Sequence, residues 1–190
     1  MSTLTVDFIT SLDGYGAAEG WPGYWGLEGP EYLAWLTQDN QQELVHLMGA
    51  NTYTLMASFA GQSDAAESQA LDNARKVVFS SSLTGPLTWA NSELVGDDAV
   101  AFVSRLKDDE TRPLRTLGSL SLCRSLITAG LVDRFRVVVF PVITGRTGKD
   151  RVYDDYPDLS LELVDSRTFD DRIQLLEYVP AVIDGPPAAR

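Results

Sequence analysis

The stretch over residues 112–140 constrains the fold of this chain more than any other part of the sequence. A short strand over 112–117 passes through Gly118-Ser119 into an amphipathic helix that ends at Gly130. The near-continuous apolar run Phe135–Phe140 then has the composition of a central strand covered on both faces. Two buried strands joined through a helix predict a parallel pair with a crossover connection, and hence an α/β fold.

The turn at Gly118-Ser119 is the strongest local indication of a ligand site. At a strand-to-helix turn with glycine at its apex, backbone N–H groups point outward and the positive end of the helix dipole favours a phosphate. The same two residues also suit an ordinary helix N-cap. The residues alone leave both interpretations open.

Hydrophobic periodicity predicts further elements on both sides of this unit. The segment 14–30 is rich in Gly, Trp and Tyr and lacks a regular period, so we expect a long functional loop there. Helices are expected over Glu31–Leu47 (one broken or two short helices, with a strand as the alternative from Leu47 onward), Asn51–Phe59 and Asp97–Lys107, with a polar surface stretch over 60–74. Strands are expected over Thr3–Ile9, Lys76–Ser80, Ser92–Val95, Leu159–Phe169 and Ile173–Val179, the last two joined as a hairpin by Asp170-Asp171.

The order of these elements predicts a three-layer α/β/α sandwich. Its central sheet is expected to be mixed, mostly parallel, and to end in an antiparallel hairpin. With 190 residues, 44% of them hydrophobic, the chain has enough material for one hydrophobic core. We therefore expect a single domain over 1–180 and a flexible tail over 181–190.

The composition excludes several classes of function. A formal net charge of −12 would repel a phosphodiester backbone or an anionic membrane, so neither nucleic acid nor membrane is an expected partner. One cysteine, Cys123, and one histidine, His46, cannot build a disulfide or a Cys/His metal site, so no metal is expected. The N-terminus enters a strand pattern without a basic or long apolar segment, and we expect a cytoplasmic protein.

Five short motifs occur in the order found in the dihydrofolate-reductase-like domains. They are Ser11-Leu-Asp-Gly14, Leu47-Met-Gly-Ala-Asn-Thr-Tyr53, Lys76-Val-Val-Phe-Ser-Ser81, Gly118-Ser119 opening a helix, and Gly130-Leu-Val-Asp133 through Pro141-Val-Ile-Thr-Gly145. Within that group the chain resembles the C-terminal reductase domain of the bacterial bifunctional riboflavin deaminase-reductase over about residues 3–179. The zinc signature of the deaminase half does not occur in the sequence.

The resemblance implies a reductase of the 5-amino-6-(5-phosphoribosylamino)uracil reductase type, acting on a small heterocycle with NADPH, or NADH, as cofactor. The dinucleotide would lie across the carboxyl ends of the strands. The resemblance places the pyrophosphate near Gly49, Asn51, Thr52, Gly118, Ser119 and Leu120, the adenosine ribose near Ser80 and Ser81, the nicotinamide near Ser11 and Gly14, and the substrate beside Trp21, Trp25 and Pro141. From the residues alone, the aromatic side chains of 14–30 either stack on a planar ring or cover the mouth of the core.

Asp13 is the candidate for the polar chemistry that accompanies hydride transfer. The dihydronicotinamide carries the hydride, so the protein has to position the two reactants and let a proton reach the product. Asp13 would donate that proton directly, polarise the substrate through a water molecule, or bind a substrate hydroxyl. The alternative is that it only shapes the Asp-Gly turn.

The sequence departs from the family pattern at several positions. Where a family member often has arginines that hold the 2′-phosphate of NADPH, this chain has Ala50-Asn51 and Ser81-Ser82. Arg134 stands where glutamate is frequent, and Gly145–Gly148 is a longer glycine turn. Two alternatives therefore stand beside the riboflavin-type reductase: a reductase of the same fold with a different or pterin-like substrate, and a non-catalytic nucleotide-binding protein.

An apolar strand in the C-terminal hairpin would leave an exposed edge in a monomer. Exposed strand edges pair readily with another chain, so we also expect a homodimer.

Overall fold

The computed structural model describes residues 1–61 and 66–186, apart from the side chains of Ala66 and Glu67. The elements in chain order are β1 (Leu4–Ser11), β2 (Tyr15–Ala18), the 3₁₀ helix η1 (Gly23–Gly26), α1 (Pro30–Asp39), β3 (Val45–Gly49), α2 (Ala50–Ala57), α3 (Ala66–Asn73), β4 (Arg75–Phe79), β5 (Ser92–Val95), α4 (Ala99–Asp109), β6 (Leu114–Thr116), α5 (Leu120–Thr128), β7 (Arg134–Phe140), β8 (Gly148–Arg151), β9 (Leu159–Phe169) and β10 (Ile173–Val182).

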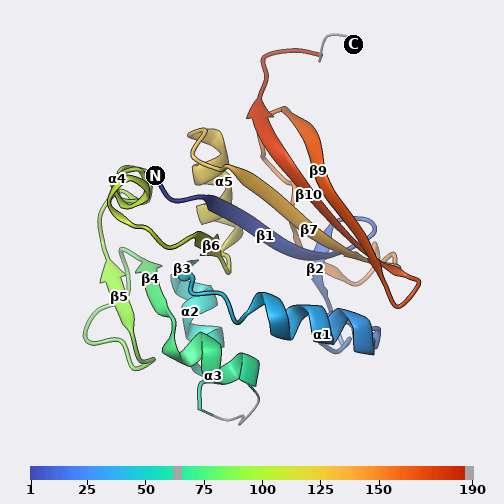
Figure 1. Cartoon of the computed structure of the whole chain (residues 1–190), viewed down its shortest axis with the longest axis horizontal. Helices are drawn as coiled ribbons and strands as arrows, with labels where there is room; N and C mark the ends of the chain where they lie inside the picture. Colours follow the sequence, from blue (N-terminus) through green and yellow to red (C-terminus); the bar gives the residue numbers. More distant parts are fainter. Residues whose placement is uncertain (62–65, 187–190) are drawn as a thin grey trace.

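Eight of the strands form one sheet in the order β5-β4-β3-β6-β1-β7-β10-β9, and β2 pairs with β8 in a separate antiparallel ribbon (Figure 1). All pairs from β5 through β7 are parallel, whereas β10 runs antiparallel to both β7 and β9. The expected mixed, mostly parallel sheet with a terminal antiparallel hairpin is confirmed. Because parallel strands share one direction, the carboxyl ends of β5, β4, β3, β6, β1 and β7 meet at one edge of the sheet.

Helices cover both faces of this sheet. Successive strand residues point to opposite faces, so Leu4, Val6 and Phe8 of β1 lie together in a core with the apolar sides of α4 and α5. On the other face α1 packs through Tyr32 against Phe140 of β7 and against the hairpin, and α2 and α3 pack over β3 and β4. In Figure 1 these three helices lie near one another in the lower half of the view. With helices on both faces of the sheet, the expected three-layer α/β/α arrangement is confirmed.

Two expectations for the middle of the chain are wrong. The segment 31–47 holds one helix, which ends at Asp39, and β3 begins at Val45. All five residues of β3 are buried, and a strand covered on both faces has the same continuous apolar sequence as a short buried helix. The stretch 60–74 contains α3, whose Leu71 packs near Trp89, although residues 62–65 lie outside the described part of the chain.

Other differences concern short elements. The expected loop over 14–30 contains β2 and η1, and β8 pairs with β2 just after the glycine turn. The C-terminal hairpin is confirmed, with β9 over the expected residues and positive φ at Asp170 and Asp171 in the turn. β10 continues to Val182, so the expected tail starts too early, and its last residues, 187–190, lie outside the described part.

The tip of this hairpin is tied to the start of α1. The carboxylate of Asp170 accepts hydrogen bonds from the backbone N–H of Glu31 at 3.0 Å and of Tyr32 at 3.1 Å. In return, Glu31 accepts a hydrogen bond from the N–H of Asp170 at 2.7 Å. The N-cap position is Gly29, and a Cβ there would lie 2.2 Å from Cγ of Asp170. A residue remote in the sequence therefore caps α1.

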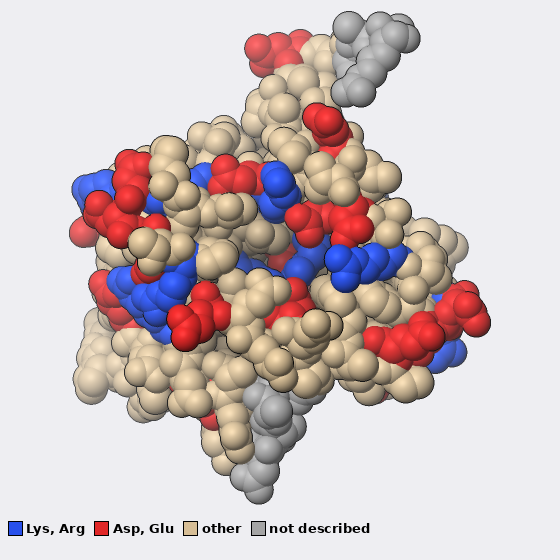
Figure 2. Space-filling model, in the orientation of Figure 1, with Lys and Arg blue, Asp and Glu red and all other residues tan. Residues whose placement is uncertain are grey.

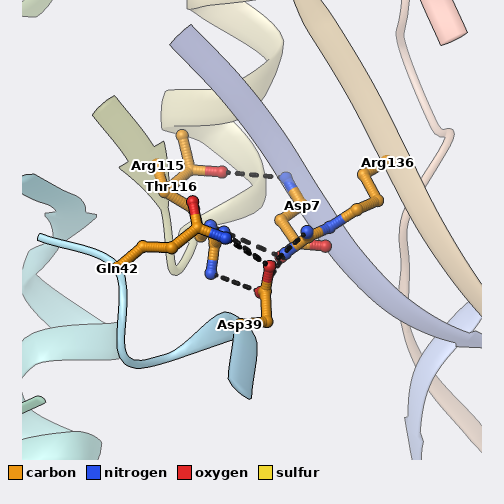
Figure 3. Close-up of polar contacts among 6 residues, drawn as sticks. All are labelled: Asp7, Asp39, Gln42, Arg115, Thr116 and Arg136. Carbon is orange, nitrogen blue, oxygen red and sulfur yellow. Dashed lines mark hydrogen bonds and ion pairs between the residues drawn. The ribbon is translucent and has the colours of Figure 1, made fainter. Parts of the chain in front are cut away.

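A buried ion cluster fixes the other end of α1 to the sheet (Figure 3). Both terminal guanidinium nitrogens of Arg115 donate to Asp39, at 2.7 and 3.2 Å, and both terminal nitrogens of Arg136 donate to it at 3.1 and 2.9 Å. Arg136 also donates to Asp7 on the neighbouring strand β1. Burial alone would raise the pKa of Asp39, but the hydrogen bonds and charges of Arg136 and Arg115 hold it below its usual value. Asp39 is therefore ionised and fully engaged.

His46, beside this cluster, predicts a loss of stability in mild acid. It is 6% exposed, and burial followed by the positive charges of Arg115 and Lys76 lowers its pKa from 6.5 to about 3, against the opposite effect of Asp39. Between these two values only the unfolded chain binds the proton, so the free energy of unfolding falls as pH decreases, by up to about 1.4 kcal/mol per pH unit. Urea unfolding at pH 7, 6, 5 and 4 measures this slope.

The variant His46→Leu is the comparison for this prediction, because it removes the titrating group and keeps an apolar side chain in the same place. Its slope over pH 6.5 to 4 should be shallower than that of the wild type. Equal slopes for the two proteins would show that His46 does not cause the pH dependence.

None of the helices found within 1–61 and 66–186 is long and apolar enough to cross a membrane. Over the same residues, no group of three or more His, Cys, Asp or Glu side chains is arranged to hold a metal ion.

Candidate functional site

The carboxyl ends of β3 and β6 form the centre of the candidate site. The N–H of Gly49, the last residue of β3, donates to the carbonyl of Gly118 at 3.1 Å. The helices that follow these strands leave on opposite faces of the sheet, α2 with the cluster around Met48 and α5 with the cluster around Val6. In open α/β sheets the crevice between two such strands is where ligands bind.

Two glycines allow the chain segments to approach closely at this crevice. Gly118 has φ +113°, and a Cβ on it would lie 2.8 Å from Oγ1 of Thr52. A Cβ on Gly49 would lie 2.5 Å from Oγ of Ser119. The peptide bond between Gly118 and Ser119 is cis. Larger residues at either glycine would push α2 and α5 apart.

The first turns of α2 and α5 present backbone donors at this crevice. The N-cap residues are Gly49 and Ser119, and at neither helix start does a capping side chain accept a hydrogen bond from the backbone N–H groups. The hydroxyl of Ser119 instead lies 2.9 Å from that of Ser121. By contrast, Asp98 caps α4, accepting from Val100 and Ala101. The donors and dipoles of α2 and α5 therefore suit an anionic group such as a pyrophosphate.

A cleft of about 400 Å³ extends from this crevice along the ends of β4 and β5. Its polar groups are mainly serine hydroxyls, with one carboxylate, and no described residue in its lining is Lys or Arg. The lining residues are Gly49, Ala50, Asn51, Phe79, Ser80, Ser81, Ser82, Gly96, Asp97, Ser119 and Ser121.

The cleft brings together half of the cofactor-site residues expected from the sequence. Gly49, Asn51, Ser80, Ser81 and Ser119 line it, Gly118 and Thr52 lie against each other beside it, and Leu120 opens α5. Sequence reasoning missed Gly96-Asp97 and Ser121. Gly96-Asp97 follows a strand that was itself predicted, so the rule that ligands bind at strand ends would have found it.

Asp13 lies further along the same edge, after β1, in a dense set of hydrogen bonds. Its carboxylate accepts from the hydroxyl of Ser11 at 2.6 Å and from the N–H of Thr144 at 3.1 Å to each oxygen. Ser11 in turn accepts from the N–H of Tyr15 at 3.0 Å. Asp13 therefore joins the β1–β2 turn, which holds Gly14, to the loop after β7.

The surroundings of Asp13 bear on the chemical roles expected for it. The hydrogen bond from Ser11 and, against the opposing effect of burial, the N–H of Thr144 hold the pKa of Asp13 below its usual value. A carboxylate in that state is ionised at neutral pH and has no proton to donate. The arrangement therefore favours accepting a hydrogen bond from a substrate over direct proton donation.

The residues around Asp13 offer apolar surface as well. Leu12 and Ile143, each adjacent to a residue of this hydrogen-bond set, are 65% and 72% exposed. Pro141 is exposed and directly follows β7. The residue after it, Val142, accepts a hydrogen bond from the N–H of Leu12 at 2.8 Å. Sequence reasoning missed Leu12 and Ile143, whose exposure cannot be read from an apolar residue type.

The two tryptophans expected at the substrate have different settings. Trp21 is 46% exposed, whereas Trp25 is 6% exposed and its ring lies 5.5 Å from that of Phe140. Trp25 therefore covers the core, which was the alternative interpretation of this segment. Arg134, one of the departures from the family pattern, begins β7 at the opposite edge of the sheet and pairs with Glu177 at 3.4 Å.

Basic groups are not gathered into one surface on the face of the molecule drawn in Figure 2. Figure 2 shows Lys and Arg side chains beside Asp and Glu side chains on that face. Arg75, for example, pairs with Glu93 at 2.9 Å and with Glu110 at 3.1 Å. Lys149 and Arg151, in the ribbon strand β8, also have acidic partners, Glu19 and Asp154.

The close approach at Gly118 predicts a stability loss for Gly118→Ala. The φ of +113° is a glycine conformation, and the new Cβ would overlap Oγ1 of Thr52, so we expect the free energy of unfolding to fall by about 3 kcal/mol. Urea denaturation of this variant and of Gly118→Ala/Thr52→Ala checks the cause, because removing the threonine hydroxyl and methyl should restore part of the loss. Gly130→Ala, with φ +67° and no atom within 4 Å, measures the backbone effect alone. Equal losses at both glycines would contradict the overlap.

Solved structures with the same fold have low sequence identity to this chain. A putative riboflavin biosynthesis protein from Shewanella sp. PV-4 has a TM-score of 0.69 at 19% identity, covering 94% of this chain and 99% of that one. A dihydrofolate reductase from Enterococcus faecalis, complexed with NADP(H), has a TM-score of 0.63 at 13% identity, covering 94% and 96%. These similarities confirm the dihydrofolate-reductase-like fold.

A longer protein also contains this fold. The diaminohydroxyphosphoribosylaminopyrimidine deaminase/5-amino-6-(5-phosphoribosylamino)uracil reductase of Thermotoga maritima has a TM-score of 0.63 at 16% identity, and the match covers 95% of this chain but 57% of that one. At the level of sequence, the family model of the RibD C-terminal domain matches residues 2–175. The chain therefore belongs to the RibD C-terminal domain family.

Proposed function

We propose that this protein is a reductase that binds a nicotinamide dinucleotide along the carboxyl edge of the sheet and reduces a small heterocyclic substrate beside Asp13. The observation that supports it most is the order of features along that edge: the cleft at β5 and β4, the phosphate-type crevice at β3 and β6, and Asp13 after β1. From β5 to β1 there are four strand spacings, about 19 Å, which is long enough for two nucleosides joined by a pyrophosphate.

In this proposal the helix starts of α2 and α5 hold the pyrophosphate, and the adenosine half lies in the cleft. The nicotinamide half lies at the end of β1, where Leu12 and Ile143 offer exposed apolar surface. When bound, the dihydronicotinamide supplies the hydride. The protein contributes position, and the ionised Asp13 accepts a hydrogen bond from the substrate and so orients it.

A substrate with a phosphate group fits the surroundings of Asp13. The exposed Arg146 follows Thr144 by two residues, and Lys149 and Arg151 lie on β8 beyond it. Lys149 and Arg151 each have an exposed acidic partner, so Arg146 is the cation that most favours an anionic substrate. Such a substrate could be a phosphoribosylaminopyrimidine, the type of compound named for the reductase of Thermotoga maritima.

The test follows NADPH and NADH oxidation at 340 nm with two candidate substrates, a phosphoribosylaminopyrimidine and a dihydropterin precursor. Nucleotide binding is measured separately by quenching of tryptophan fluorescence. Cofactor oxidation that requires the pyrimidine supports the proposal. Cofactor oxidation that requires the pterin instead would assign the protein a pterin-like substrate. Binding without oxidation of either cofactor would point to a non-catalytic nucleotide-binding protein, and the absence of binding would overturn the proposal.

We also propose that the protein is a homodimer that pairs through β9. This 11-residue strand is at the edge of the sheet, and Leu161, Leu163 and Val164 are 43%, 54% and 47% exposed. Light scattering after size-exclusion chromatography should give twice the monomer mass at micromolar concentration. The variant Leu163→Lys should give the mass of the monomer. A monomeric wild type would contradict this proposal.

The proposed setting is the cytoplasm. Cys123 is a free, buried thiol, and burial raises its pKa to about 12, which suits an unreactive core residue in a reducing compartment.

A further inference from the structure

We infer that the cleft selects a dinucleotide whose adenosine ribose carries no 2′-phosphate, with Asp97 as the residue that binds the ribose hydroxyls. The inference rests on the proposed function, because that proposal assigns the adenosine half to the β4–β5 end of the site. It makes NADH, rather than NADPH, the preferred cofactor.

The charge of the cleft opposes a second phosphate group. No described residue in its lining is basic, and its single charged group is the exposed carboxylate of Asp97. A phosphate monoester adds a charge of about −1.5 to −2 at neutral pH. It would lie close to Asp97 in a protein with a net charge of −12, so both the local and the overall field repel it.

Several backbone donors near this end of the cleft are already used. The hydroxyl of Ser80 accepts from the N–H groups of Ser82 at 3.1 Å and Leu83 at 3.0 Å. Asp98 accepts from Val100 at 2.9 Å and Ala101 at 3.3 Å, which occupies the positive end of α4.

The crevice between β3 and β6 differs in this respect. No side chain caps α2 or α5 there. The site therefore provides two helix starts without a capping side chain for the pyrophosphate, whereas the protein itself occupies several of the donors at the far end of the cleft.

The same groups suit a ribose with both hydroxyls free. The carboxylate of Asp97 accepts hydrogen bonds but donates none, and ribose hydroxyls are donors that form stronger bonds to an ionised acceptor. The hydroxyls of Ser81 and Ser82, which line the same part of the cleft, add groups that both donate and accept. A 2′-phosphate would remove one hydroxyl donor and bring a negative charge to the carboxylate.

The experiment compares dissociation constants of NADH and NADPH for the full chain by tryptophan quenching at two ionic strengths. We expect NADH to bind at least tenfold more tightly at 0.05 M salt. Added salt should narrow this ratio, because it screens the repulsion of NADPH. Asp97→Asn should weaken the binding of NADH and bring the dissociation constants of NADH and NADPH closer together. Ser81→Arg should strengthen the binding of NADPH.

Asp108→Asn is the matched control, because it removes the same charge at the exposed far end of α4 and should leave the ratio unchanged. NADPH binding as tight as or tighter than NADH would overturn the inference and leave the proposed function in place. Failure of both nucleotides to bind at millimolar concentration would overturn both. An unchanged ratio in Asp97→Asn would show that Asp97 is not the selecting residue.

Discussion

Asp39→Asn is expected to lower the free energy of unfolding by about 3–5 kcal/mol, the largest stability effect predicted for this protein. The carboxylate lies 7% exposed between Arg115 and Arg136 and accepts four hydrogen bonds from them. The neutral amide leaves two buried guanidinium groups without their main counter-charge, and its NH₂ group turns one acceptor into a donor facing a donor. Urea denaturation of the two proteins at pH 7 measures the difference.

The pH dependence gives a second readout of the same change. The pKa of Asp39 is lower in the folded than in the unfolded protein, so its contribution is present above about pH 4 and is lost as the pH falls through the folded value. In the variant Asp39→Asn, the free energy of unfolding should lack this contribution and its dependence on pH. Asp154→Asn, which removes an exposed partner of Arg151, should cost less than about 1 kcal/mol. A loss at Asp39 as small as that control would mean that the cluster does not hold α1.

Asp13→Asn is expected to reduce kcat/KM by about 10- to 100-fold, the loss of one hydrogen bond to a charged acceptor. The amide keeps the shape of the turn and one oxygen for Thr144, but it carries no charge for a substrate donor. The proposed sites of the adenosine and the pyrophosphate lie towards the other end of the sheet edge, and only the nicotinamide approaches Asp13. The dissociation constant of the nucleotide should therefore change much less than kcat/KM. Steady-state oxidation of the reduced nucleotide and tryptophan quenching measure the two quantities on the same preparation.

Asp158→Asn, at an exposed position, controls for the change in net charge and should behave as the wild type. If Asp13 only shapes the β1–β2 turn, Asp13→Asn will lower thermal stability and leave kcat/KM unaffected. That pattern would remove Asp13 from the proposed site.

The sequence predicted the edge of the sheet better than it predicted the interior. Ser80 follows a strand whose apolar run is distinctive, whereas Gly49 and Gly118 come from the motifs of the family resemblance. Parallel strands necessarily bring such positions to one edge. β3 was missed because full burial removes the alternation that distinguishes a strand from a helix. β2 was missed because Tyr15–Ala18 has two alanines and a glycine and no apolar alternation.

The ion cluster could not be predicted from local patterns. Asp39 is 76 residues from Arg115 and 97 residues from Arg136 in the sequence. All three are charged residues, which usually lie at the surface. The same holds for Trp25, whose burial depends on the packing of Phe140 against it. The hydrogen bonds that the N–H of Thr144 donates to Asp13 likewise join residues that only the fold brings together.

The two attachments of α1 have a consequence for folding. Its N-terminus is capped by Asp170, 139 residues from Glu31, and its C-terminus is held by strands that come much later in the chain than the helix itself. A helix of 10 residues is too short to persist in water by itself. The helix therefore depends on loop closures over most of the chain, so α1 belongs to the last structure to form during synthesis and refolding, after β7 and the C-terminal hairpin exist to receive it.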